Sequence, residues 1–264
     1  MNKNIIFFDI DGTIISEKTR LIPNSTKEAI NKIREKGHLA FINTGRPISE
    51  ITPQIRDLGF DGYVCGCGTY IEYNNEVLLY KSLGKELSKE IALDINKYNL
   101  EAILEGSEKI YFDKPENITH KVILDIIDQH KHEGFFKPRT WYEDDVDIDK
   151  LVIFLTENSN LKDFYEKYKD IFDFIKRDED FYELVPLGYS KASGIEYLLN
   201  KLNIPHKNTY AIGDSTNDLS MLNYVENSIA MGNSHPKLFE SVSYITKEVD
   251  EDGIYLALKH YNMI

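Results

Sequence analysis

Residues 5–13 read IIFFDIDGT, an apolar run that gives way to two aspartates and a glycine. The apolar character of Ile5–Ile10 predicts a strand that is buried on both faces of a parallel sheet. Asp9 and Asp11 come at the carboxyl end of that strand, where open α/β sheets bind their ligands. This stretch therefore predicts both the kind of sheet and the edge at which a site lies.

Strands and helices alternate in the two ends of the chain, and this order predicts a doubly wound parallel sheet of the α/β class. The N-terminal part is expected to contain a helix at Lys27–Lys36, a strand at His38–Asn43, a helix from Pro47 to about Leu58 and a strand at Tyr63–Cys65. The C-terminal part is expected to contain a helix at Lys191–Leu202, a strand at Thr209–Ile212, a helix at about Thr216–Tyr224, a strand at Ser228–Met231 and a helix near Gly253–Tyr261.

The middle of the chain has a different pattern. A hairpin is expected at Tyr70–Tyr73 and Glu76–Tyr80, and beyond it strands and helices follow in the looser order of an α+β domain. The helices are expected at Lys85–Tyr98, Pro115–His130 and Asn160–Lys169, and the strands at Ala102–Leu104, Ile110–Phe112, Leu151–Leu155, Phe172–Lys176 and Phe181–Val185. The expected domains are a core of residues 1–82 and 188–264 and an inserted domain at 83–187.

The composition is typical of a globular chain, with 42% hydrophobic and 28% charged residues among 264. No apolar run approaches the roughly 20 residues of a membrane span, and the N-terminal run is too short for a signal peptide. The net charge of −13 argues against a nucleic-acid partner. Cys65 and Cys67 are poorly placed for a mutual disulfide, because alternate strand residues point to opposite faces. We therefore expect a cytoplasmic protein without membrane contact, and the sequence points to no protein partner.

Asp9 and Asp11 suggest chemistry beyond the end of a strand. Two carboxylates two residues apart repel each other and attract a divalent cation. Asp9 could attack a phosphorus atom, because aspartate forms aspartyl-phosphate intermediates in enzymes. Asp11 could protonate the leaving oxygen and later deprotonate the attacking water. The alternative is an Asp-Gly turn that only ends the strand.

A second acidic segment, Gly213–Asp218, follows another buried strand and would lie at the same edge of the sheet. Mg²⁺ takes about six oxygen ligands and keeps several waters, so one or two carboxylates with a substrate phosphate suffice. Asp214 is the candidate metal ligand, and Asp218 is expected to hold a coordinated water or a neighbouring side chain. A polar loop that caps the next helix would explain the hydroxyl residues here but not the two aspartates.

The segment after the second predicted strand combines a hydroxyl, exposed backbone N–H groups and a helix N-terminus, which together form an anion site. Thr44 could bond a phosphoryl oxygen, and Gly45 lets the backbone approach it. Arg46 is either a substrate contact or a solvated surface arginine. Lys191 becomes a candidate because the clustered aspartates need a cation to offset an incoming phosphate, and Asn217 could orient it.

Taken together, these residues resemble the four motifs of the haloacid dehalogenase superfamily in their expected order. The motifs are Asp9-x-Asp11-Gly12-Thr13, Thr44-Gly45-Arg46, Lys191 and Gly213-Asp214-x-x-Asn217-Asp218. The acid at Asp11 resembles the phosphatase branch, because dehalogenases of the superfamily lack it. The long insertion between the second and third motifs is similar to that of the type IIB, Cof-like group of sugar-phosphate and related phosphatases.

The resemblance implies a Rossmann-like core with a mobile C2-type cap, and Mg²⁺-dependent hydrolysis of small phosphorylated metabolites such as sugar phosphates. Asp9 would be the nucleophile that carries the phosphoryl group, and Asp11 the acid/base. Asp9, the backbone carbonyl of Asp11 and Asp214 would bind Mg²⁺, with Asp218 in the outer shell. The residues expected to contact the phosphoryl group or the substrate are Gly12, Thr44, Gly45, Arg46, Lys191 and Asn217.

Alternatives remain open at this point. The same core could serve a phosphotransferase such as a sugar phosphomutase, or a regulator that binds phosphate without catalysis. Cys67 stands where the family usually has an asparagine, which leaves substrate contacts there undecided. The aromatic and acidic stretch Trp141–Asp145 could stack on a substrate ring or pack inside the cap.

Overall fold

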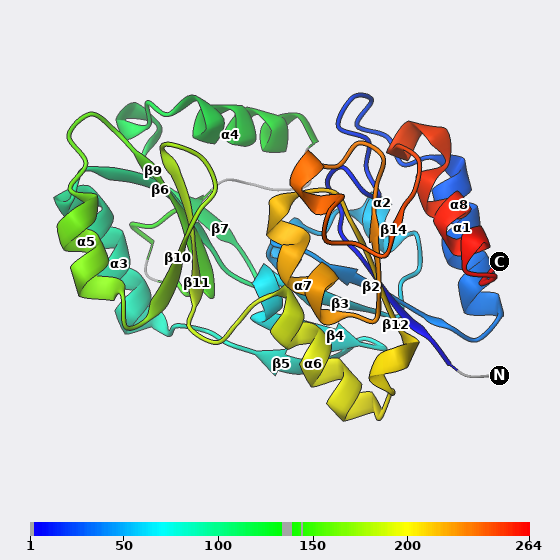
Figure 1. The fold of residues 1–264 in the computed structure, drawn as a ribbon. Coiled ribbons are helices and arrows are strands. Elements are labelled where there is room, and N and C mark those ends of the chain that lie inside the picture. Colours follow the sequence, from blue (N-terminus) through cyan, green and yellow to red (C-terminus); the bar gives the residue numbers. More distant parts are fainter. Residues whose placement is uncertain (1–2, 134–138, 144) are drawn as a thin grey trace. The chain divides into compact units, whose positions relative to one another are not determined.

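The structure, a computed structural model, describes residues 3–133, 139–143 and 145–264. The chain divides into two units (Figure 1). The first comprises Met1–Gly45, Pro53–Leu79 and Ser190–Ile264, and the second comprises Arg46–Thr52 and Tyr80–Tyr189. The short segment that follows Thr44-Gly45 thus groups with the second unit. The domain boundaries expected between residues 82 and 83 and between 187 and 188 stay predictions.

Apolar segments of the first unit form an eight-stranded sheet in the order β14-β13-β12-β1-β2-β3-β4-β5. The pairs from β14 to β3 are parallel, whereas β3 and β4 are antiparallel. The strands are β1 (Ile5–Phe8), β2 (Leu39–Asn43), β3 (Gly62–Cys65), β4 (Tyr70–Tyr73), β5 (Glu76–Tyr80), β12 (Thr209–Gly213), β13 (Asn227–Ala230) and β14 (Tyr244–Ile245). The predicted parallel sheet made from both ends of the chain is confirmed.

Helices cover both faces of this sheet, as a doubly wound fold requires. They are α1 (Asn24–Glu35), α2 (Pro53–Arg56), α6 (Lys191–Leu202), α7 (Leu219–Tyr224) and α8 (Gly253–His260). Ile195 of α6 and Met221 of α7 pack in one buried cluster with Ile5 and Phe7 of β1. Helices α1 and α8 lie side by side on the other face (Figure 1).

The predicted helix from Pro47 to Leu58 is wrong. The structure has a 3₁₀ turn at Ile48–Glu50, an extended Ile51, and then the short α2. Pro53 explains the break, because its ring disfavours a helical conformation in the preceding residue and its nitrogen has no proton to donate. The predicted helices at 115–130 and 216–224 also begin as separate 3₁₀ turns, before α4 (Lys121–Glu133) and α7.

The second unit has its own six-stranded sheet in the order β10-β11-β9-β6-β7-β8. Its strands are β6 (Leu100–Glu105), β7 (Ile110–Phe112), β8 (Arg139–Thr140), β9 (Lys150–Leu155), β10 (Phe172–Lys176) and β11 (Phe181–Pro186). Leu104, Leu151 and Leu184 face a cluster with α3 (Lys85–Lys97) and α5 (Leu161–Tyr168), whereas Val152 and Phe154 face α4. Two apolar layers thus enclose the sheet, as expected for an α+β domain.

Trp141 is 4% exposed and belongs to the buried cluster around α3 and α5. The packed-core interpretation is therefore right for this residue, while Asp144 lies outside the described residues. Tyr142 is exposed, and its hydroxyl donates to Asp113 Oδ1 at 2.9 Å.

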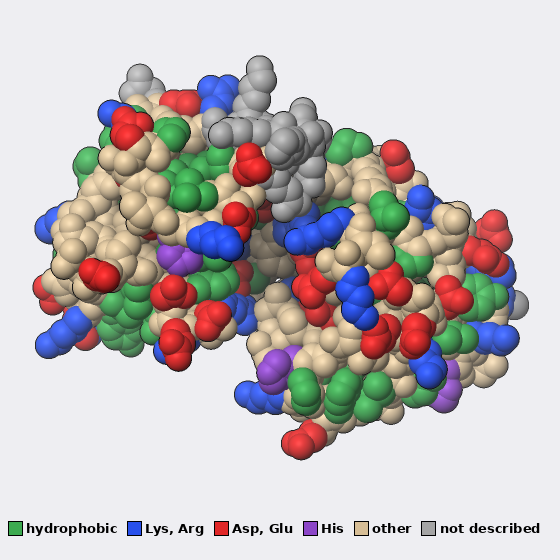
Figure 2. All heavy atoms as spheres, turned by 90° about the horizontal axis from the view of Figure 1, so that it is seen from above, with side chains coloured by type: hydrophobic (Ala, Val, Ile, Leu, Met, Phe, Trp, Pro, Cys, Tyr) green, Lys and Arg blue, Asp and Glu red, His purple; other side chains and the backbone are tan. Residues whose placement is uncertain are grey.

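Over the part of the chain that the structure describes, no helix has both the length and the apolar composition to cross a bilayer. On the face shown in Figure 2, outside the grey atoms, Lys and Arg side chains are interspersed with Asp and Glu. That face shows none of the broad basic surface by which proteins bind a nucleic-acid backbone.

Candidate active site

Three neighbouring parallel strands carry the predicted aspartates and threonine to one edge of the first sheet. β1 ends at Phe8 just before Asp9, β2 ends just before Thr44, and β12 ends just before Asp214. β1 pairs with both β2 and β12, so the three loops leave the sheet side by side. This is the edge at which open α/β sheets bind ligands.

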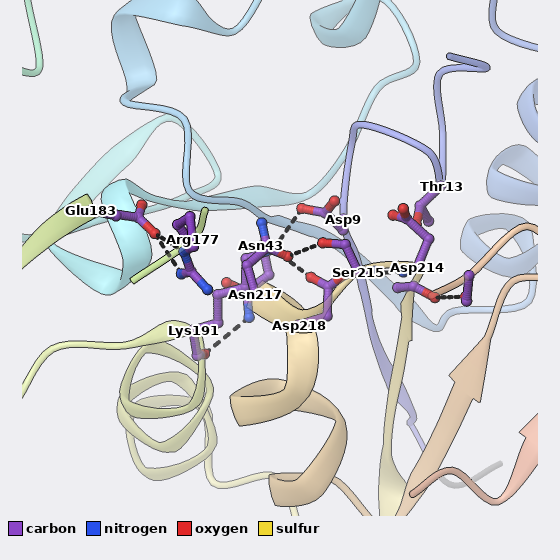
Figure 3. A network of polar contacts seen from close by, with 12 residues as sticks. Asp9, Thr13, Asn43, Arg177, Glu183, Lys191, Asp214, Ser215, Asn217 and Asp218 are labelled. Atoms are coloured by element: carbon purple, nitrogen blue, oxygen red, sulfur yellow. Dashed lines mark hydrogen bonds and ion pairs between the residues drawn. The ribbon is translucent and has the colours of Figure 1, made fainter. Parts of the chain in front are cut away.

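Lys191 lies between two of the aspartates (Figure 3). Its Nζ atom is 2.6 Å from Asp9 Oδ1 and 2.5 Å from Asp218 Oδ1, and its side chain is 1% exposed. Burial alone would lower the pKa of Lys191, but the carboxylates of Asp218 and Asp9 outweigh burial and raise it. Lys191 is therefore a permanent positive charge inside the site.

The start of α6 fixes the position of Lys191. Ser190 caps the helix, because its Oγ accepts a hydrogen bond from the Ser193 N–H at 3.1 Å. In return the Ser190 N–H donates to Ser193 Oγ at 2.9 Å. This reciprocal capping box determines where α6 begins, and Lys191 is its first residue.

Asp218 uses both of its oxygens inside the protein. Oδ1 contacts Lys191, and Oδ2 accepts from the backbone N–H groups of Asp214 at 2.9 Å and Ser215 at 3.0 Å. A carboxylate engaged in this way is a poor direct ligand for a metal ion, since both of its oxygens and three of its about four lone-pair positions are already used. Asp218 instead orients the lysine and shapes the loop that carries Asp214.

Asp214 lies against the loop of the first motif. Its Oδ1 accepts from the Thr13 hydroxyl at 3.0 Å. Gly12 has φ +75°, and a Cβ atom there would lie 2.3 Å from Asp214 Oδ2. Only glycine suits this position, because it adopts positive φ without strain and leaves room for the carboxylate.

The site carries more negative charge than its lysine neutralises. Asp9, Asp214 and Asp218 each offer an oxygen, and these oxygens lie within 4.8 Å of one another. Burial, and then the Asp218 carboxylate, raise the pKa of Asp9 to about 7 despite Lys191. Burial, and then the Asp9 carboxylate, raise the pKa of Asp214 to about 8. A second cation beside Asp9 and Asp214 would relieve this repulsion.

The other predicted residues occupy the same loops with different exposure. Thr44 is 2% exposed, and its N–H donates to the Val64 carbonyl at 2.9 Å. Asp11 and Gly45 are half-buried, as is Arg46, which groups with the second unit.

Asn217, expected to orient Lys191, accepts a hydrogen bond from Ser215 Oγ at 2.6 Å. Of the two candidates in that loop, Asp218 is the one that contacts the lysine ammonium.

Two asparagines outside the expected set also contact the site. Asn43 Nδ2 donates to the Lys191 carbonyl at 3.0 Å, and Asn233 Nδ2 donates to the Gly12 carbonyl at 2.8 Å. The polar Asn43 at the end of the apolar run 39–43 was a signal that could have been used. Asn233 lies in an irregular loop and carries no pattern that would have revealed it.

The family model for haloacid dehalogenase-like hydrolase matches residues 6–258, which is nearly the whole chain. The chain belongs to this family. Haloacid dehalogenase-like hydrolases are enzymes, and the order of the four motifs seen in the sequence agrees with this membership.

The chain is similar to several phosphatases along its full length. It is 30% identical to a Bacillus subtilis (strain 168) protein named "Putative phosphatase YkrA", with 100% of both chains covered. It is 26% identical to the B. subtilis 5-amino-6-(5-phospho-D-ribitylamino)uracil phosphatase YcsE, over 97% of this chain and 95% of the relative. A solved sugar phosphatase of HAD subclass IIB shares 27% identity and a TM-score of 0.80, with 99% and 100% coverage. These matches support a type IIB HAD phosphatase as the enzyme class of this chain.

Proposed function

We propose that this HAD hydrolase is a Mg²⁺-dependent phosphatase that acts on small phosphomonoesters through an aspartyl-phosphate on Asp9. One observation carries the proposal: three buried carboxylates cluster at the carboxyl edge of the sheet, and Lys191 contacts two of them. Such a site suits a substrate that brings negative charge together with a divalent cation.

The residues of the site fit Mg²⁺. This ion prefers oxygen ligands and is commonly held by one or two carboxylates, with substrate phosphate and water completing its shell. Asp9, Asp214 and the backbone carbonyl of Asp11 would hold it, and Asp218 would remain outside because both of its oxygens are engaged. The ion, when bound, would neutralise charge on the phosphoryl oxygens.

The first half-reaction transfers the phosphoryl group to the protein. A carboxylate oxygen of Asp9 attacks phosphorus, an Asp9–phosphorus bond forms, and the bond from phosphorus to the ester oxygen breaks. Asp11 donates its proton to the departing oxygen, so that the product leaves as a neutral alcohol. Thr44 and Lys191 hold the other phosphoryl oxygens during the transfer.

The second half-reaction releases phosphate. Asp11, now a carboxylate, accepts a proton from water as the water oxygen attacks phosphorus. The bond between Asp9 and phosphorus breaks, which restores the Asp9 carboxylate and liberates inorganic phosphate. Asp11 is again protonated, so the cycle balances and needs no further reactant.

The names of two similar proteins support a substrate class. One is named for a phosphorylated ribitylamino compound and another for sugar phosphates, and both compounds are small phosphorylated metabolites. We infer a substrate of this kind for the present chain. We also place the reaction in the cytoplasm, where thiols such as the buried Cys65 and Cys67 stay reduced.

The test is p-nitrophenol release from p-nitrophenyl phosphate, measured for the wild type and Asp9→Asn with Mg²⁺ and with EDTA. We expect turnover only for the wild type with Mg²⁺, and a loss of about a thousandfold or more in Asp9→Asn. The exposed Asp57 offers a matched control, because Asp57→Asn makes the same chemical change on the surface.

Substantial turnover by folded Asp9→Asn would exclude Asp9 as the nucleophile. Turnover that is unaffected by EDTA would exclude the metal. With a panel of sugar phosphates, release of inorganic phosphate supports a phosphatase, whereas an isomerised sugar phosphate would identify a phosphomutase instead.

A further inference from the structure

We propose that Asn43 is a positioning residue that holds Lys191 in register with the phosphate site. The inference rests on the proposed function, in which Lys191 binds the transferring phosphoryl group. Asn43 is the last residue of β2 and immediately precedes Thr44, so it joins the loop of the second motif to the helix that carries the lysine.

The contact is short, buried and specific in direction. Asn43 is 0% exposed, and its Nδ2 atom lies 3.0 Å from the backbone carbonyl of Lys191 (Figure 3). Because a carbonyl can only accept, the NH₂ end of the amide must face Lys191. The orientation of the Asn43 side chain is therefore fixed by the first residue of α6.

The other end of the same amide argues against a purely structural role. Asn43 Oδ1 is buried and has no hydrogen-bond partner among the described residues. A buried acceptor without a partner costs about 1–3 kcal/mol, a cost that an apolar side chain would avoid. Packing alone does not explain an asparagine here, whereas the bond to the Lys191 carbonyl does.

The start of α6 is otherwise held by close backbone packing. A Cβ atom on Gly68 would lie 2.5 Å from the Ser190 carbonyl oxygen, and one on Gly194 would lie 2.4 Å from Val64 Cγ1. The absence of side chains at these two glycines lets the helix pack directly against the turn at Gly66–Gly68 and against β3. Asn43 adds the polar contact from β2, at the residue from which the ammonium group extends.

Loss of this contact should displace the lysine rather than unfold the site. Lys191 Nζ lies between Asp9 and Asp218 at 2.6 and 2.5 Å, so even a small shift of the first turn of α6 would change both distances. Misplacement of a positioned group by about 1 Å can cost a hundredfold in rate. Asn43 should therefore affect phosphate binding by controlling the position of Lys191.

A double-mutant cycle tests this coupling with inorganic phosphate as the probe. Isothermal titration calorimetry in the presence of Mg²⁺ would give the phosphate Kd of the wild type, Asn43→Ala, Lys191→Ala and the double variant. We expect Asn43→Ala to raise the Kd about tenfold and Lys191→Ala to raise it further. The double variant should bind no more weakly than Lys191→Ala, because Asn43 has nothing left to position.

Asn208 provides the matched control, since its Nδ2 also donates to a backbone carbonyl, that of Lys3, at 3.2 Å. Asn208→Ala should leave the phosphate Kd unchanged. Should Asn43→Ala fail to fold, Asn43→Leu keeps a similar side-chain size, removes the donor without adding a charge, and enters the same cycle.

Two results would overturn the inference and leave the proposed function intact. One is an Asn43→Ala variant with the wild-type phosphate Kd. The other is a double variant whose fold-increase in Kd equals the product of the two single fold-increases. A wild-type Kd for Lys191→Ala would instead refute the phosphate-binding role of the lysine, and the inference with it.

Discussion

Each unit of the protein buries a lysine between two carboxylates. In the first unit Lys191 contacts Asp9 and Asp218. In the second unit Lys150 is 2% exposed, and its Nζ lies 2.5 Å from Glu105 Oε2 and 2.9 Å from Glu183 Oε1.

The lysine of the second unit belongs to a network, here called the matched network, in which each oxygen of Glu183 has a cation beside it. Arg177 adds a second cation, with its Nε 2.9 Å from Glu183 Oε2. Burial would raise the pKa of Glu183, but Lys150 and Arg177 outweigh it and hold the pKa well below its usual range. Burial, with a contribution from the Glu50 carboxylate, raises the pKa of Glu105 to about 8 despite Lys150, so the charges match at Glu183 and not at Glu105.

The lysine of the first unit is outnumbered. Asp214 adds a third carboxylate to the two that Lys191 contacts, and the pKa values of Asp9 and Asp214 are raised to about 7 and 8. A matched network can be complete by itself, whereas an unmatched one gains from a further cation. We therefore interpret the network around Lys150 as one that stabilises the fold, and the group around Lys191 as a site that binds a ligand.

The largest expected effect comes from removing the lysine of the matched network. Lys150→Met removes a cation from both Glu105 and Glu183, and breaking a buried pair in this way costs about 3–5 kcal/mol. The free energy of unfolding, measured by urea denaturation, should fall by that amount. Lys169→Met is the control, because Lys169 and Glu166 form an exposed pair worth at most about 1 kcal/mol. Equal losses in the two variants would contradict a stabilising role for the buried network.

A smaller effect is expected on Tm when Mg²⁺ is added, and it should depend on the carboxylates around Lys191 but not on those around Lys150. Binding to the folded state at 100 times Kd adds about 2.7 kcal/mol, which corresponds to several degrees in Tm. Thermal unfolding of the wild type should show this shift, and Asp214→Asn should lose it. Glu183→Gln, the same change in the matched network, should keep it. A Tm shift that survives in Asp214→Asn would place the metal elsewhere.

The fold was predictable where the pattern of residues is local. The hairpin strands at Tyr70–Tyr73 and Glu76–Tyr80 and the helix Lys191–Leu202 have the expected bounds, because alternation and amphipathic spacing are properties of the segment itself. The prediction of a helix from Pro47 was wrong because Pro53 interrupts the helical backbone, and the spacing of apolar residues gives no sign of this interruption. The two-residue strand β14 is too short to carry any pattern.

The gathering of the aspartates was predictable for a different reason. Asp9 and Asp214 each follow a buried parallel strand, and the geometry of such sheets brings their carboxyl ends to one edge. No comparable sequence pattern predicted the matched network around Lys150. Glu105, Lys150 and Glu183 lie within strands or at their ends, where a charged residue usually faces solvent. That this face is buried depends on tertiary packing.

The smallest expected effect concerns the pH dependence of the matched network. The folded pKa of Glu183 is lowered from 4.5, so its carboxylate stabilises the fold above that pH and loses this contribution as the pH falls. At neutral pH, Glu183→Gln should be less stable than the wild type. The difference in free energy of unfolding between the two proteins should become smaller below about pH 4.5, by at most about 1.4 kcal/mol per pH unit. Urea denaturation at several pH values between about 6 and 3.5 measures it, with the exposed Glu166→Gln as a control whose difference from the wild type stays within about 0.5 kcal/mol. A gap that does not change with pH would show that Glu183 stabilises the sheet through its shape and hydrogen bonds rather than its charge, and the contrast between the two lysine sites would lose its electrostatic basis.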